Sequence, residues 1–336
     1  MTVQAVPTES PQGPGEPSPL LGWDGAVAGD PPDDRVAVHY GDPLREQRSF
    51  EDAVGGFVDR SSRDVVTVTG PDRLSWLHSL TSQHLTELAP GQGVEALVLS
   101  PHGHVEHHLS VLDDGATTWI DVEPGTGAAL VGFLDRMRFM LRVEVALVSD
   151  VYAVLTLVGA ATTGDLAVPD VPRRAMPWGT DLLVARTELE HVAHTLADAG
   201  VRPVGLSAFE AQRVEQGRPR FGFETDHRTI PNELPWLETA VHLQKGCYRG
   251  QETVARTHNL GRPPRRLVQL HLDGAVPPRG SAIVWEGKQV GFVGTAVMHA
   301  ELGPIALAMV KRRVPDDAAL RTGDDAEIAA GISPLS

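Results

Sequence analysis

Cysteine is almost absent from this chain, because Cys247 is the only one among its 336 residues. One thiol cannot close an internal disulfide, and it cannot supply the four thiolates of an iron–sulfur cluster. No metal or cluster is therefore expected to be held by this chain alone. The N-terminus has no Lys or Arg before Arg35 and no apolar segment after Met1, so a secretory signal is not predicted. These absences favour a cytoplasmic protein.

Long apolar runs are also missing. Stretches such as Ala128 to Leu134 and Pro304 to Val310 fall far short of the roughly 18 residues that a membrane-spanning helix needs, so no membrane partner is expected. A hydrophobic content of 41% with 22% charged residues is typical of a globular protein. The net charge of −15 repels polyanions, so direct nucleic-acid binding is not expected either.

Composition divides the chain into three parts. Residues 1–34 contain seven prolines and five glycines with few large apolar groups, which predicts a disordered tail. Residues 35–260 mix strand and helix patterns without a steady βαβ repeat, which predicts α+β packing. After the Gly261-Arg262-Pro263-Pro264 segment only short strand patterns follow, so residues 261–336 are predicted to form a small β-barrel domain.

The periodicity of apolar residues predicts individual elements in the second and third parts. Strands are expected at 65–68, 96–99, 105–112, 118–122, 143–148, 151–158 and 182–185, and again at 266–272, 282–285, 290–297 and 305–310. Helices are expected from the 74–80 run and at 128–140, 188–199 and 207–216.

The lone cysteine lies in a run dense in functional groups, Lys245-Gly246-Cys247-Tyr248-Arg249-Gly250-Gln251-Glu252. Cations two residues before and after Cys247 would share its face in an extended segment and favour the thiolate. The alternative is that Cys247 is a small buried apolar residue, as free cysteines often are. The run opens a basic stretch that ends at Arg266 and holds six basic residues and one acid, which suits a small anion or a solvated, salt-bridged loop.

This run, extended through Thr253-Val254-Ala255-Arg256, resembles the signature of the YgfZ family, relatives of the glycine-cleavage aminomethyltransferase. The resemblance covers about residues 64 to 314, including Val68-Thr69-Gly70-Pro71-Asp72 near its start and residues 306–312 near its end. It implies an aminomethyltransferase-like folate-binding fold with a C-terminal barrel, and tetrahydrofolate as bound ligand. It also implies partners among iron–sulfur client proteins or assembly factors.

The resemblance assigns roles to particular residues. Glu215, in Arg213-Val214-Glu215-Gln216-Gly217, matches the glutamate that recognises the pterin ring, and a carboxylate can accept two parallel hydrogen bonds from such a ring. Cys247 is the expected catalytic thiol. The other expected folate-binding residues are Lys245, Gly246, Tyr248, Gly250, Gln251, Glu252 and Arg256. Glu252 and Arg256, four residues apart, have the alternative of pairing with each other on a helix.

A histidine group, His102, His104, His107 and His108, lacks a distinctive ligand spacing, so no metal site is predicted. The position of this histidine group in the chain bears on the transferase reaction. In active aminomethyltransferases the corresponding stretch ends in a pair of acids needed for one-carbon transfer, whereas His107-His108 stand here. An imidazole does not supply the same fixed negative charge, which puts the transferase reaction in doubt.

The resulting hypothesis is a tetrahydrofolate-binding accessory protein that supports iron–sulfur cluster assembly or repair in client enzymes, including tRNA-modifying radical enzymes. The first alternative is a folate-dependent aminomethyl transferase. The second is an interaction module that binds tRNA through the basic stretch.

Overall fold

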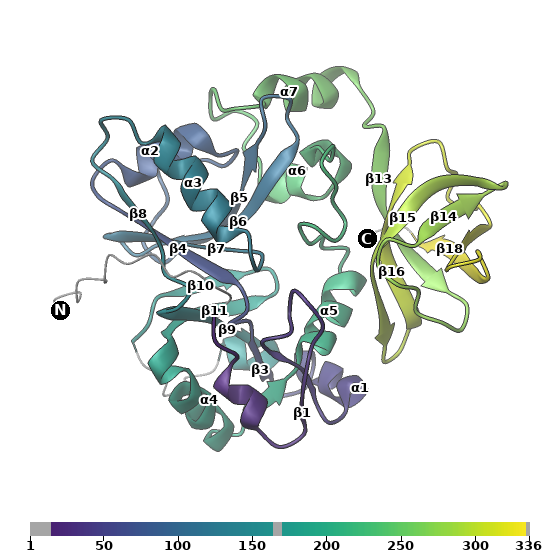
Figure 1. Cartoon of the computed structure of the whole chain (residues 1–336), viewed down its shortest axis with the longest axis horizontal. Coiled ribbons are helices and arrows are strands. Elements are labelled where there is room, and N and C mark those ends of the chain that lie inside the picture. Colours follow the sequence, from purple (N-terminus) through teal and green to yellow (C-terminus); the bar gives the residue numbers. More distant parts are fainter. Residues whose placement is uncertain (1–14, 164–169, 334–336) are drawn as a thin grey trace.

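Two five-stranded sheets and a closed six-stranded barrel form the framework of the protein (Figure 1). The structure, a computed structural model, describes residues 15–163 and 170–333. In Figure 1 the two sheets occupy one side of the molecule and the barrel the other, with α5 between them. This arrangement confirms the predicted α+β class with a C-terminal barrel.

The first sheet has the strand order β5-β6-β7-β4-β8, and every neighbouring pair is antiparallel. Alternation along its strands separates two cores, because Val66 and Val68 face the helices whereas Val65 faces the second sheet. Leu77 and Leu130 bring the covering helices α2 and α3 into the first of these cores. The elements are β4 (Asp64–Thr69), α2 (Arg73–Leu80), β5 (Gly93–Leu99), β6 (Val105–Asp113), β7 (Thr117–Val122), α3 (Gly127–Met137) and β8 (Glu144–Leu147).

The second sheet has the order β10-β11-β9-β3-β12, in which only the β12–β3 pair is parallel. Val192 and Leu196 of α4 pack on it against Leu155. Trp119 and Leu183 join the two sheets in a shared apolar cluster. The elements are β3 (Gly56–Asp59), β9 (Tyr152–Val158), η3 (Gly159–Thr162), β10 (Arg173–Met176), β11 (Gly179–Ala185), η4 (Arg186–Glu188), α4 (Leu189–Asp198) and β12 (Arg202–Val204).

Four short elements connect the sheets to the barrel, namely α5 (Leu206–Glu215), η5 (Pro231–Glu233), α6 (Trp236–Thr239) and α7 (Gln251–Leu260). The barrel closes because β13 pairs with both β16 and β18. Its strands are β13 (Arg265–Leu272), β14 (Ala282–Trp285), β15 (Lys288–His299), β16 (Gly303–Lys311), β17 (Leu320–Thr322) and β18 (Ile328–Ser333). No helix in the described part of the chain is long and apolar enough to cross a membrane.

The prediction of a disordered tail to residue 34 is wrong for residues 15–34. This segment forms η1 (Pro19–Gly22) and β1 (Ala26–Ala28), and β1 pairs with β2 (Ala37–Tyr40). Leu20 is fully buried in the same cluster as Phe57, and Trp23 packs against that cluster, so the few apolar residues of this segment anchor it to the second sheet. Residues 1–14 lie outside the described part. The chain continues from β2 into α1 (Pro43–Glu46) and η2 (Gln47–Phe50).

Candidate functional site

A cavity of about 340 Å³ lies where the two sheets meet α5 and α6. Its volume is that of a small-molecule pocket. Its walls carry aromatic rings and an unusual number of charges. The charged lining residues are five arginines (Arg60, Arg63, Arg213, Arg218 and Arg220) and four acids (Asp33, Glu95, Glu123 and Glu210).

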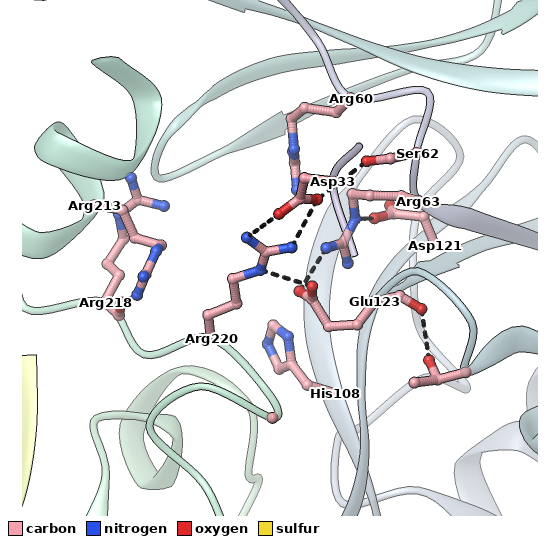
Figure 2. A network of polar contacts seen from close by, with 12 residues as sticks. Asp33, Arg60, Ser62, Arg63, His108, Asp121, Glu123, Arg213, Arg218 and Arg220 are labelled. Carbon is pink, nitrogen blue, oxygen red and sulfur yellow. Dashed lines mark hydrogen bonds and ion pairs between the residues drawn. The ribbon is translucent and has the colours of Figure 1, made fainter. Parts of the chain in front are cut away.

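Arg220 is the centre of the ion-pair network in this cavity (Figure 2). Its guanidinium contacts Asp33 at 2.8 Å and Glu123 at 2.7 Å, and Glu123 also pairs with Arg63 at 2.6 Å. Burial disfavours the charged form of Glu123, but the two guanidinium groups hold its pKa far below the usual value. Burial raises the pKa of Asp33, although Arg220 opposes that shift.

Arg174 extends the network behind the cavity and joins the two sheets. This fully buried residue of β10 pairs with Asp121 of β7 and, at 2.8 Å, with Asp181 of β11. Asp181 in turn accepts from Arg60 at 3.1 Å. Opposite charges therefore compensate one another across the interface between the two sheets.

The histidine pair of β6 is divided between two environments. Because successive strand residues point to opposite faces, His108 lines the cavity and His107 does not. His108 Nε2 lies 2.7 Å from Glu95 Oε1, and its ring stacks on Trp236 with centroids 4.4 Å apart. Burial disfavours the Glu95 carboxylate, but the hydrogen bond and charge of His108 keep its pKa below the ordinary value. Glu95 therefore supplies a carboxylate next to His108, in the part of the cavity where the sequence predicted a loss of negative charge.

Two arginines and two aromatic rings form one wall of the cavity. The guanidinium carbon of Arg60 lies 5.6 Å from the ring centroid of Trp178 and 5.0 Å from that of Phe209. The corresponding distances for Arg218 are 5.4 Å and 5.6 Å. These cation–π contacts place two guanidinium groups against the rings of Trp178 and Phe209, so this wall of the cavity combines aromatic rings with positive charge.

The Lys245–Glu252 run follows α6 and ends in the first turn of α7, and none of its residues lines the cavity. Cys247 is exposed, which overturns the alternative of a buried apolar cysteine. Lys245 Nζ donates to the carbonyls of His78 and, at 2.5 Å, Thr81 at the end of α2, and burial lowers its pKa to about 8. Tyr248 is buried in the cluster that contains Trp236, under the ammonium of Lys245. Lys245 and Tyr248, both expected to bind folate, therefore make contacts within the protein instead: Lys245 with backbone carbonyls and Tyr248 with the apolar core.

Glycine at position 250 is required by packing. Gly250 has a φ of 82°, and a Cβ there would lie 2.6 Å from the carbonyl oxygen of Ser100. Gly246 also has a positive φ, of 99°, but faces open space. Gln251 begins α7, and Glu252 and Arg256 are exposed one turn apart on it, with no ion pair between them among the described residues.

Three of the six basic residues in the basic stretch pair with acids from other segments. Arg249 pairs with Glu106 at 3.2 Å, and Arg266 pairs with Asp316 at 2.5 Å. Arg265 pairs with acids on both sides, Asp226 and Glu233, each at 2.7 Å. This favours the salt-bridged alternative over a free anion receptor.

Glu215, the expected pterin reader, is the last residue of α5 and does not line the cavity. Its carboxylate accepts from Gln212 at 3.0 Å and lies 3.6 Å from His299 of the barrel. The next residue, Gln216, does line the cavity. The role of Glu215 stays a prediction.

Sequence reasoning missed most of the cavity. Asp33 lies in the segment predicted to be disordered, and Arg60, Trp178, Arg218 and Arg220 match no motif. Strand alternation was the available signal for His108, since only one of two adjacent strand residues can face a pocket. No group of three or more His, Cys, Asp or Glu residues within 15–163 and 170–333 is arranged to hold a metal ion.

Comparison with known proteins agrees with this architecture. Residues 265–332 match the glycine cleavage T-protein C-terminal barrel domain. An aminomethyltransferase of Parasynechococcus marenigrum is 26% identical, over 92% of this chain and 91% of its own. A putative chloroplastic transferase of Arabidopsis thaliana is 28% identical over 70% of this chain, and the match spans only 60% of that relative.

Among solved structures, the glycine cleavage system aminomethyltransferase T from Bartonella henselae superposes with a TM-score of 0.81 at 20% identity, covering 94% of this chain and 95% of that one. The chain therefore has the fold of that aminomethyltransferase, and its residues 265–332 match the T-protein barrel domain. The resemblance to the aminomethyltransferase superfamily, and within it to the YgfZ family, stays a prediction for the chain as a whole.

Proposed function

We propose that this chain binds tetrahydrofolate in the central cavity and acts as an accessory protein for iron–sulfur enzymes. It would support cluster assembly or repair in client proteins, including radical enzymes that modify tRNA. The observation that carries the proposal is the cavity itself, set in a fold similar to that of an aminomethyltransferase. His108 lines this cavity, at a position where the resemblance implies an acid in active transferases.

The cavity residues fit a reduced folate. Rings of Trp178, Phe209 and Trp236 provide flat apolar walls for a planar heterocycle. The carboxylate of Glu95 offers an acceptor for ring N–H groups, and the arginines offer donors. Bound there, tetrahydrofolate would supply a one-carbon carrier. The protein's own groups would orient it and exclude water.

Cys247 is the residue we propose to act toward clients. It is exposed, and it follows α6 by a short loop, while Trp236 and Thr239 of α6 line the cavity. Tyr248 anchors that loop in the same apolar cluster as Trp236. Ligand binding beside Trp236 would therefore affect the position of the Cys247 loop through the contacts of this cluster. The proposed accessory role needs such a link between the folate and the thiol.

Titration of the protein with tetrahydrofolate by calorimetry tests the ligand. Saturable one-to-one binding is expected, and heats equal to dilution would reject the proposal. Glu215→Gln tests that residue separately. A loss of tenfold or more supports pterin recognition, whereas unchanged affinity transfers the task to a carboxylate in the cavity such as Glu95.

The accessory role is tested in cells that lack the protein. Cys247→Ser should fail to restore the activity of an iron–sulfur enzyme, while the purified variant binds tetrahydrofolate with the affinity of the wild type. Full restoration by Cys247→Ser would remove the thiol from the mechanism.

A folate-dependent aminomethyl transferase is the second candidate. The relatives named aminomethyltransferase favour it, and so does the Glu95–His108 pair, in which a carboxylate contacts an imidazole, a group that serves as general acid or base in many enzymes. Steady formation of methylenetetrahydrofolate from tetrahydrofolate and an aminomethyl donor by the pure protein, lost in Glu95→Gln, would select this function over the accessory role.

A further inference from the structure

Arg218 differs from the other four arginines of the cavity in lacking a carboxylate partner. Each of the others pairs with at least one acid: Arg60 with Asp181, Arg63 with Glu123, Arg213 with Glu210 and Arg220 with Asp33. Among the described residues, no acid lies within 4 Å of the Arg218 guanidinium. Its Nε donates to the side-chain oxygen of Gln216 at 2.9 Å.

The Nη2 group of Arg218 is buried and has no hydrogen-bond partner within residues 15–163 and 170–333. Buried donors are nearly always satisfied, and a charged one left alone is costly. Burial and the positive charges of Arg213 and Arg60 lower the pKa of Arg218 to about 9, because nearby acids do not compensate fully. An anion beside this guanidinium would remove both penalties.

The surroundings of Arg218 restrict which anion fits. Trp178 and Phe209 flank the guanidinium, so a flat ring can lie along the same wall. Trp178 also borders a second cavity of about 440 Å³, which shares Pro177 and Gln216 with the first. The two cavities therefore lie next to each other, with Trp178 lining both.

We propose that Arg218 is the receptor for a carboxylate carried on, or bound beside, a flat ring in this cavity. Part of this inference rests on the proposed function, because one source of the carboxylate is the benzoylglutamate half of tetrahydrofolate. The other source is a separate small carboxylic acid that binds next to the pterin. Both use the same chemistry, a planar carboxylate facing a planar guanidinium.

Binding of four probes to wild type and Arg218→Gln separates these sources. The probes are tetrahydrofolate, 4-aminobenzoyl-glutamate, 6-methyltetrahydropterin and benzoate, measured by calorimetry. Arg136→Gln, at an exposed position on α3, is the control for loss of one arginine. Arg218→Lys, which keeps the charge, should recover part of the affinity, and thermal unfolding verifies that each variant is folded.

If the folate supplies the carboxylate, Arg218→Gln weakens tetrahydrofolate and 4-aminobenzoyl-glutamate at least tenfold and leaves 6-methyltetrahydropterin within twofold. If a separate acid supplies the carboxylate, Arg218→Gln weakens benzoate tenfold and leaves the affinity of the other three probes unchanged. The inference is overturned if no carboxylate probe loses affinity, if none binds the wild type, or if the pterin fragment weakens as much as tetrahydrofolate. Failure of tetrahydrofolate to bind the wild type rejects the folate proposal alone, because benzoate still tests Arg218.

Discussion

Asp33 and Arg220 form an ion pair of 2.8 Å inside the cavity although 187 residues separate them in the chain. The N-terminal segment that carries Asp33 is therefore part of the site. It reaches that position because η1 and the β1–β2 pair hold it against the second sheet.

Leu20→Ala tests whether this segment is integral to the fold. Leu20 is fully buried, so truncation is expected to lower the free energy of unfolding by about 2 to 5 kcal/mol. Leu44→Ala is the matched control, because Leu44 is 42% exposed and should cost much less. Urea denaturation measures both variants. Equal, small effects would mean that residues 15–34 contribute little to stability.

Arg174→Met tests the buried ion pairs between the sheets. The substitution leaves Asp121 and Asp181 without their shared partner in the interior, and a loss of about 3 to 5 kcal/mol in unfolding free energy is expected. Arg142→Met is the control, since the Arg142–Asp72 pair lies at the surface and exposed ion pairs contribute little to stability. Similar unfolding midpoints for the two variants would contradict this view of the network.

His107 predicts a particular dependence of stability on pH. Burial lowers its pKa from 6.5 to about 4, so between these values the unfolded chain binds more protons than the folded one. Stability is therefore lost as pH falls from 6.5 towards 4, by about 3 kcal/mol from this residue. His107→Leu should flatten the profile relative to wild type, whereas His271→Leu, at an exposed position, should not. Parallel profiles of wild type and His107→Leu in urea titrations at each pH would refute the assignment.

Cys247 is expected to react fully with iodoacetamide in the native protein, because its side chain is exposed. As the only cysteine, it gives a single mass increment that mass spectrometry counts without ambiguity. Labelling that requires denaturant would contradict the exposed position. Saturating tetrahydrofolate should change the labelling rate if, as proposed, the thiol responds to the cavity.

Local pattern was enough to predict the framework. The alternation that predicts a strand over 105–112 is realised in β6, and the leucine spacing over 74–80 is realised in α2. The 128–140 helix ends three residues early, at Met137, where the chain turns out into solvent and Met140 takes a positive φ of 57°. These features depend on neighbours in sequence, which a single sequence displays.

The cavity depends on partners far apart in sequence, which a single sequence does not display. Nothing near Arg174 indicates Asp121, and nothing near Asp33 indicates Arg220. Motif resemblance singled out Cys247 and its loop as a candidate site. It could not show that Lys245 donates hydrogen bonds to the end of α2 or that Tyr248 is a core residue. Those facts follow from packing against α2 and α6.

The packing of Gly250 against the Ser100–Gly103 turn has a further consequence for the thiol. A Cβ at Gly103 would lie 2.7 Å from the Cβ of Thr253 in α7, and a Cβ at Gly250 would lie 2.9 Å from the Cα of Gly103. Neither glycine therefore has room for a side chain. At the other end of the loop, Lys245 donates a hydrogen bond to the carbonyl of Thr81 at the end of α2. The loop is therefore held on both sides of Cys247. If Cys247 acts toward client proteins, as proposed, the partner would have to approach a thiol whose loop is held at both ends, so the direction of approach would decide which proteins are served.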